Sequence, residues 1–108
     1  MATLTPQQVV RTGLEATYTA AAGGGDVFPN TGREIVDIVN GGGGDITLTI
    51  VTPGTYQGQA LADDAVVVTA GERRHVGPFP PEMYNNSSGQ VALAYSGVTS
   101  VTVAILKI

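Results

Sequence analysis

The alternation of apolar and small polar residues most constrains what this chain can form. Between Asp45 and Val51, every second residue is a large aliphatic one, and the residues between them are Thr47, Thr49 and Val51. A β-strand points successive side chains to opposite faces, so this pattern predicts a strand with one face in a core. No long window shows the three- and four-residue apolar spacing of an amphipathic helix. The sequence therefore predicts an all-β fold.

Six further segments carry strand patterns separated by Gly, Asn and Pro. They are Gln90–Ser96, Ser100–Ile108 and the weaker segments Glu15–Ala20, Arg33–Asn40, Asp64–Ala70 and Arg73–Gly77. Short strands at this spacing are typical of a β-sandwich, a jelly roll or a small barrel. A chain of 108 residues has room for one domain. We therefore expect a compact β-sandwich or jelly-roll-like domain over residues 13–108.

The first twelve residues lack a strand rhythm. Their apolar residues include Leu4, Val9 and Val10, and Thr5-Pro6 favours an extended start. Terminal segments without internal partners become ordered only when something else holds them. We therefore expect residues 1–12 to form an N-terminal arm that contacts a neighbouring subunit, with a first strand that needs a neighbour as the alternative.

Composition excludes several classes of function. The 5 basic and 9 acidic residues give a net charge of −4 without a basic patch, which argues against a nucleic-acid partner. The absence of cysteine excludes disulfide scaffolds, thiol nucleophiles and thiolate metal sites. No apolar run approaches the roughly 20 residues of a membrane helix, and Met1–Thr5 do not resemble a signal peptide. We expect no membrane partner, and folding in a cytoplasm.

Catalytic and metal-binding patterns are weak. His75 is the only histidine and has no recognisable nucleophile, so we expect an exposed strand residue and no enzymatic activity. The run Asn40–Asp45 lacks the Lys-Ser/Thr of a phosphate loop and predicts a flexible hairpin between two strands. The aspartates lack the spacing of a calcium loop, so acidic turn residues are favoured over a metal site. We expect no cofactor.

Two short motifs are candidates for contact with a partner. Arg73 and Arg74 fit either a basic contact or, as we favour, a solvated pair that protects an edge strand. The segment Phe79–Tyr84 contains Pro-Pro-x-x-Tyr, one residue longer than a WW-domain ligand. We favour a corner in which Phe79 and Tyr84 plug the end of the sandwich, with an exposed anchor as the alternative.

The C-terminal strand pattern is apolar on both faces near its end. Val101, Val103 and Ile105 form one face, and Leu106 lies on the other. A strand with one solvated side does not require this, and an exposed apolar flank marks a subunit interface. We expect a homo-oligomer with Leu106 near its contact surface.

Six segments, spread over nearly the whole chain, form a recognisable set of turns and strand patterns: Gly13–Ala21, Asn40–Gly43, Thr49–Pro53, Ala70–Glu72, Val76–Pro81 and Val98–Ala104. Through these segments the chain resembles small structural proteins of tailed bacteriophages and prophages, most of all the head decoration, or cement, proteins. These motifs consist of turns and strand rhythm and transfer no catalytic residue.

The resemblance implies a cofactor-free virion protein on the capsid exterior, assembled in the cytoplasm of a bacterial host. Its partner would be the major capsid protein, and its own oligomer would be a trimer. Two alternatives remain open: another virion component, such as a head–tail or tail ring subunit, and a carbohydrate-binding jelly-roll module. A sugar platform would have to use Tyr18, Tyr56, Tyr84 and Tyr95, because the chain has no Trp.

Overall fold

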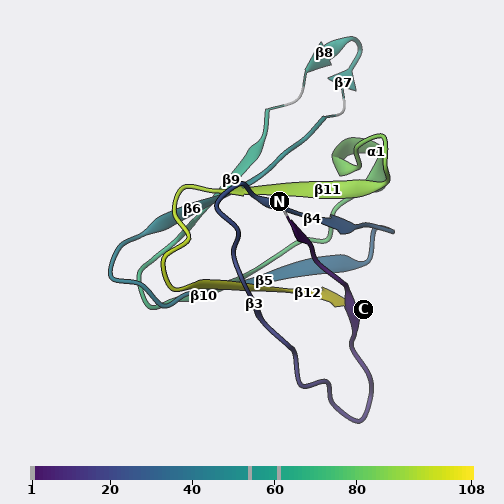
Figure 1. The fold of residues 1–108 in the computed structure, drawn as a ribbon. Helices are drawn as coiled ribbons and strands as arrows, with labels where there is room; N and C mark the ends of the chain where they lie inside the picture. The colour runs from purple at the N-terminus through teal and green to yellow at the C-terminus, as the bar shows by residue number, and fades with distance from the viewer. Residues whose placement is uncertain (1, 54, 61) are drawn as a thin grey trace.

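The computed structural model describes residues 2–53, 55–60 and 62–108, and it is an all-β sandwich of two packed sheets (Figure 1). Sheet A has the strand order β1-β4-β11-β6-β9, and its strands are β1 (Ala2–Thr3), β4 (Asp26–Pro29), β6 (Ile46–Ile50), β9 (Asp64–Val68) and β11 (Gln90–Tyr95). Sheet B has the order β10-β5-β12-β2, with β3 also paired to β12. Its strands are β2 (Gln7–Gln8), β3 (Thr19–Ala20), β5 (Glu34–Asn40), β10 (Arg73–Val76) and β12 (Val101–Lys107). A small hairpin of β7 (Thr55–Tyr56) and β8 (Gln59–Ala60) projects away from both sheets (Figure 1).

The core lies between the two sheets and is built from the alternating aliphatic residues. Its fully buried side chains include Phe28, Leu48 and Leu93 from sheet A and Ile38 and Ile105 from sheet B. In β6 the inward residues are buried and the two threonines between them are half-buried. The period of two in the sequence is therefore the period with which side chains enter the core.

Six of the seven predicted strands begin and end within two residues of their predicted bounds. Only the last two residues of the predicted strand Glu15–Ala20 are paired, as β3. Strand β4 was not expected, because it is only four residues long and lies between two turn motifs. Its Phe28 is nevertheless fully buried against β11.

The N-terminal segment is a correction to the expected arm. β1 pairs in parallel with β4, and β2 pairs in parallel with the C-terminal half of β12. The Leu4 N–H donates to the carbonyl of Val27 at 2.7 Å, and Leu4 is only 6% exposed within the core cluster. One leucine and two short backbone ladders thus hold this segment on both sheets. Its sequence lacks the alternation of apolar and polar residues that would have indicated a strand.

The glycine run is also different from the expected hairpin. It connects β5 in sheet B to β6 in sheet A, so it forms an arch between the layers. The Asn40 side chain holds this arch, because its amide donates to the carbonyls of Gly44 and Val68 and its oxygen accepts the N–H of Gly42. Glycine fits at position 42 because the Cβ of any larger residue there would lie 3.0 Å from the Thr99 carbonyl oxygen.

The proline-rich segment closes one end of the sandwich, as we favoured. Pro81–Tyr84 form a one-turn helix, α1, which begins with a proline at a position where no backbone N–H is needed. The Phe79 ring is buried, with its centroid 5.9 Å from that of Phe28 and 5.3 Å from that of Tyr84. In the described part of the chain no helix has the length and apolar character to span a membrane.

Candidate functional site

The outer face of sheet A is the first candidate surface. Cross-strand neighbours on this face are Thr47 and Val67, then Ala65, Thr49 and Ala94, and then Ala92, Val27 and Thr3. All of these described side chains are small or medium-sized and uncharged. Because charged residues are depleted at the centre of protein interfaces, such a face is suited to contact with another protein.

The acidic residues of sheet A point the other way. Asp26 is fully buried on the inward side and accepts a hydrogen bond from the Tyr95 hydroxyl at 2.8 Å. Asp64 lies on the same side of its strand as the buried Val68 and accepts a hydrogen bond from the Tyr84 hydroxyl. Burial, the hydrogen bond and the charge of Asp26 raise the pKa of Tyr95 well above its ordinary value. These carboxylates therefore leave the outer face without charge.

A second candidate surface is an apolar patch where the two chain ends meet. The Val9 N–H donates to the carbonyl of Lys107 at 2.8 Å, next to Ile108. Val9 is 41% exposed, Val10 and Ile108 are also exposed, and Leu106 is half-buried on the neighbouring position of β12. We call Val9, Val10, Leu106 and Ile108 the terminal patch. The sequence analysis predicted contact roles for Val9, Val10 and Leu106. The fold brings these residues to one end of sheet B.

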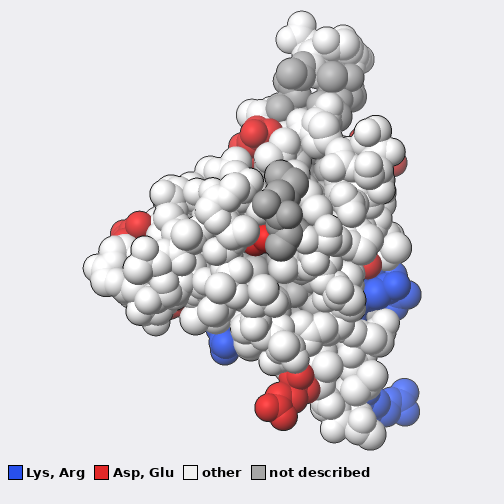
Figure 2. Space-filling model, viewed as in Figure 1, with Lys and Arg blue, Asp and Glu red and all other residues white. Residues whose placement is uncertain are grey.

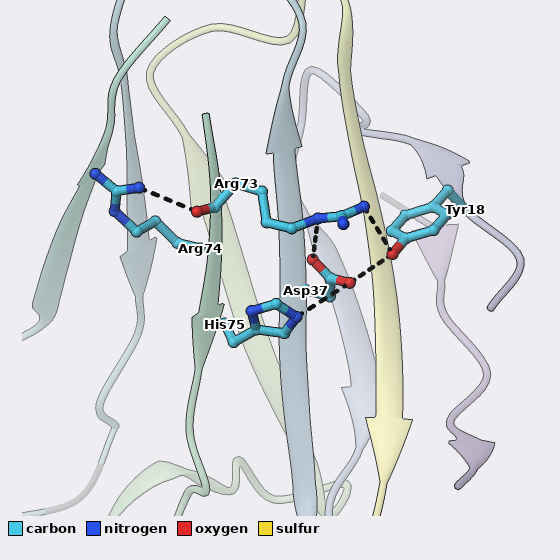
Figure 3. A network of polar contacts seen from close by, with 5 residues as sticks. All are labelled: Tyr18, Asp37, Arg73, Arg74 and His75. Atoms are coloured by element: carbon cyan, nitrogen blue, oxygen red, sulfur yellow. Dashed lines mark hydrogen bonds and ion pairs between the residues drawn. The ribbon is translucent and has the colours of Figure 1, made fainter. Parts of the chain in front are cut away.

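The outer face of sheet B carries a polar cluster instead (Figure 3). At its centre is the Asp37 carboxylate, whose side chain is 4% exposed. Its Oδ2 accepts the Tyr18 hydroxyl at 2.5 Å and lies 3.5 Å from Nε2 of His75, and its Oδ1 lies 3.4 Å from Nε of Arg73. Arg73 also donates to the Tyr18 hydroxyl at 3.2 Å. The groups come from β5, β10 and the residue before β3, so the cluster ties three segments together.

The chemistry of this cluster is structural. The hydrogen bond to Asp37, burial and the Asp37 charge raise the pKa of Tyr18, and the positive charge of Arg73 opposes them. The neutral hydroxyl is therefore held as a donor, which is opposite to what a tyrosine base needs. The His75 side chain is 55% exposed on an edge strand, as predicted from the sequence.

The remaining sequence candidates fall into separate places. Arg74, on the edge strand β10, pairs with the exposed Glu72 at 2.6 Å, whereas Arg73 lies in the Asp37 cluster and is not simply one of a solvated pair. Phe79 is buried and Tyr84 half-buried, so neither is an exposed anchor. Leu4 belongs to the core. The sequence did not indicate the cluster around Asp37. The alternation around Thr47 and Thr49 indicated a face open to solvent or a partner on that one strand, but not that the uncharged face continues over the neighbouring strands.

The other polar candidates do not converge. Within residues 2–53, 55–60 and 62–108, no three His, Cys, Asp or Glu side chains come together as metal ligands. Asp45 accepts the N–H of Ala70, and Asp63 accepts the N–H of Thr52. The hydroxyls of Tyr18, Tyr84 and Tyr95 each bind a different carboxylate, and the side chain of Tyr56 lies outside what the structure describes.

Comparison with protein-family models gave no match, and comparison with curated proteins and with solved structures gave none either.

Proposed function

We propose that this chain is a non-enzymatic virion protein that binds the outer surface of a phage capsid and stabilises it. The proposal starts from the resemblance to head decoration proteins in Gly13–Ala21 and the later motifs, and the two-sheet sandwich agrees with the fold which that resemblance implies. Its partners would be the major capsid protein and further copies of itself.

The observation that carries the proposal is the uncharged outer face of sheet A. Thr49 at its centre is flanked by Ala65 and Ala94, and these small side chains present a face without long charged groups that need water. Figure 2 shows the same tendency over one whole view, in which charged residues form small separate groups around uncharged expanses. We assign this face to the capsid, because charged residues are depleted at the centre of protein interfaces, as they are here.

Repetition explains how a modest contact stabilises a capsid. A protein that binds only the assembled shell lowers its free energy with every occupied site, by mass action. Copies that contact one another as well as the shell bind more tightly than isolated copies, because the second contact forms at high effective concentration. We assign the terminal patch to the contact between copies, as a trimer in line with the resemblance.

The test uses expanded capsids assembled from the major capsid protein of the phage or prophage that encodes this chain. We expect the purified chain to co-sediment with these capsids and to raise the temperature at which they lose their contents. Ala94→Lys places a charge on the outer face of sheet A and should abolish co-sedimentation.

The matched control is Ala20→Lys, which puts the same charge on an exposed alanine of sheet B. It should bind as the unaltered chain does. Capsids that neither bind the chain nor gain heat resistance from it would contradict the proposal. Electron microscopy of the particle would show whether the chain lies on the shell or, as the alternative holds, in a head–tail or tail ring.

A further inference from the structure

The edge strands of the two sheets are unequally protected against pairing with another strand. An exposed edge strand presents unpaired backbone groups, and proteins protect such edges by making them short or by placing charge on them. Sheet A ends at β1, which is two residues long, and sheet B ends at the two-residue strand β2 and at β10 with Arg73, Arg74 and His75. The remaining edge is β9, with the sequence Asp-Ala-Val-Val-Val. This five-residue edge has one charged residue, at its first position.

The backbone of β9 offers a regular row of hydrogen-bonding groups. Antiparallel strands bond to each neighbour through alternate residues. On β6, the carbonyl of Thr47 accepts the N–H of Ser96 in the neighbouring chain segment, so odd-numbered residues of β6 bond toward β11 and even-numbered ones toward β9. Because Leu48 pairs with Val66, the even-numbered residues of β9 bond to β6. The N–H and C=O groups of Ala65 and Val67 therefore point away from β6, toward the open edge of the sheet. Among the described strands, β9 pairs with β6 alone.

We propose that β9 is a self-association edge, through which two copies of this chain pair antiparallel about a two-fold axis and join their A sheets into one. The axis passes between the two Val66 residues. Each Ala65 then faces the Val67 of the other copy, so a small side chain meets a larger one on the outer face in both directions.

The charge pattern favours a second copy as the occupant. In this register each Asp64 faces a Val68, so the two carboxylates do not oppose one another, and each already accepts the Tyr84 hydroxyl of its own chain. The same pairing at β10 would bring Arg73 and Arg74 of the two copies together, and like charges directly opposed destabilise a sheet. Val67 is 56% exposed, and pairing would place Ala65 of the other copy beside its side chain.

This contact does not depend on the proposed role on a capsid, and it is separate from the terminal patch. A trimer uses two different surfaces of each copy, whereas the β9 contact uses the same surface twice. The two can therefore coexist, and they can be removed one at a time.

The first test measures molar mass by light scattering in a Leu106→Asp background, where the terminal patch carries a charge. We expect this variant to be a dimer at high protein concentration. Adding Val67→Lys should convert it to a monomer, because each copy would then carry a lysine at the contact and lysine on an edge strand opposes pairing with another strand. Adding Ala94→Lys, on the same outer face but two strands from the edge, should leave the dimer intact.

The second test uses the chain without the Leu106 change and relies on its lack of cysteine. In the proposed dimer, Ala65 and the Val67 of the other copy form a hydrogen-bonded antiparallel pair. The Cα atoms of such a pair lie about 5.5 Å apart, within the range of about 4.4–6.8 Å that disulfides span. Ala65→Cys with Val67→Cys should give a covalent dimer under mild oxidation, much faster than the single variant Ala94→Cys. Three results would each overturn the proposal: the Leu106→Asp chain stays monomeric, the dimer persists after Val67→Lys, or the double cysteine variant cross-links no faster than Ala94→Cys. A monomeric Leu106→Asp chain and slow cross-linking are also the results expected if β9 accepts a strand of another protein. None of these results bears on co-sedimentation with capsids.

Discussion

Replacing Leu4 by alanine tests whether the N-terminal segment belongs to the fold or serves only as an attachment arm. Leu4 is 6% exposed in the core cluster, and its N–H is bound to the carbonyl of Val27. Buried Leu→Ala changes cost about 2–5 kcal/mol, with the larger losses where a cavity cannot collapse. Leu4 also lines an open hollow of about 340 Å³ beside Thr17 and Thr19, so its surroundings can relax. We therefore expect a loss of about 2–3 kcal/mol, near the lower end of that range.

Urea unfolding followed by circular dichroism measures this loss. For a chain of this size, about 2–3 kcal/mol corresponds to a fall in Tm of about 10 °C. Deleting residues 1–8 should cost more, because it also removes Gln7, whose side-chain amide both donates to and accepts from the Thr17 backbone at 2.8 Å.

Val9→Ala and Val10→Ala are the matched controls within the same segment. Both side chains are exposed, so each change should alter the free energy of unfolding by no more than about 0.5 kcal/mol. If Leu4→Ala were as mild as these controls, the segment would not be part of the core, and the expectation of an arm over residues 1–12 would be restored.

Three further changes probe the core and the buried polar groups. Phe79→Ala should cost about 3–5 kcal/mol in urea unfolding, because the ring is buried between two other aromatic rings. The pKa of Tyr95 is higher in the folded chain than in the unfolded chain. Its contribution to stability is therefore complete below about pH 10 and falls as pH rises further. Tyr95→Phe should reduce this loss of stability at alkaline pH. The pKa of Glu34 is lowered, because hydrogen bonds from Thr31 and Arg33 and the charge of Lys107 outweigh the effect of burial. Its contribution is complete above about pH 4 and is lost as pH falls through the folded value, so Glu34→Gln should flatten the acid side of the stability curve.

Strand positions were predictable because burial imposes a period of two on the sequence. β6 shows this directly, since Ile46, Leu48 and Ile50 alternate with threonines and all three enter the core. β4 shows the limit, because four residues between two turns are too few to display a period. For the N-terminal segment, two-residue ladders and the single side chain of Leu4 leave no periodic trace at all.

The polar sites were less predictable because they depend on pairing between distant strands. Asp37 meets His75 because β10 lies beside β5 in a register that puts these two residues opposite one another. Tyr18 reaches the same carboxylate from the residue before β3. Nothing in the local sequence of any of the three segments specifies this meeting. The glycine arch is similar, since Asn40–Asp45 has the composition of a hairpin turn and only the assignment of β5 and β6 to different sheets makes it an arch.

The distribution of charge links the fold to its proposed contacts. The described strand residues of sheet A include two carboxylates, Asp26 and Asp64, and each binds a tyrosine hydroxyl on the inward side. On sheet B, by contrast, the exposed edge strand carries Arg73 and Arg74, and each has an acidic partner within its own sheet or turn. Charge therefore protects the edge and outer face of one sheet, while the outer face and the β9 edge of the other have no such protection. A sandwich that stayed alone in solution would gain from charge on both sheets, and this asymmetry is the physical reason to look for contacts on sheet A.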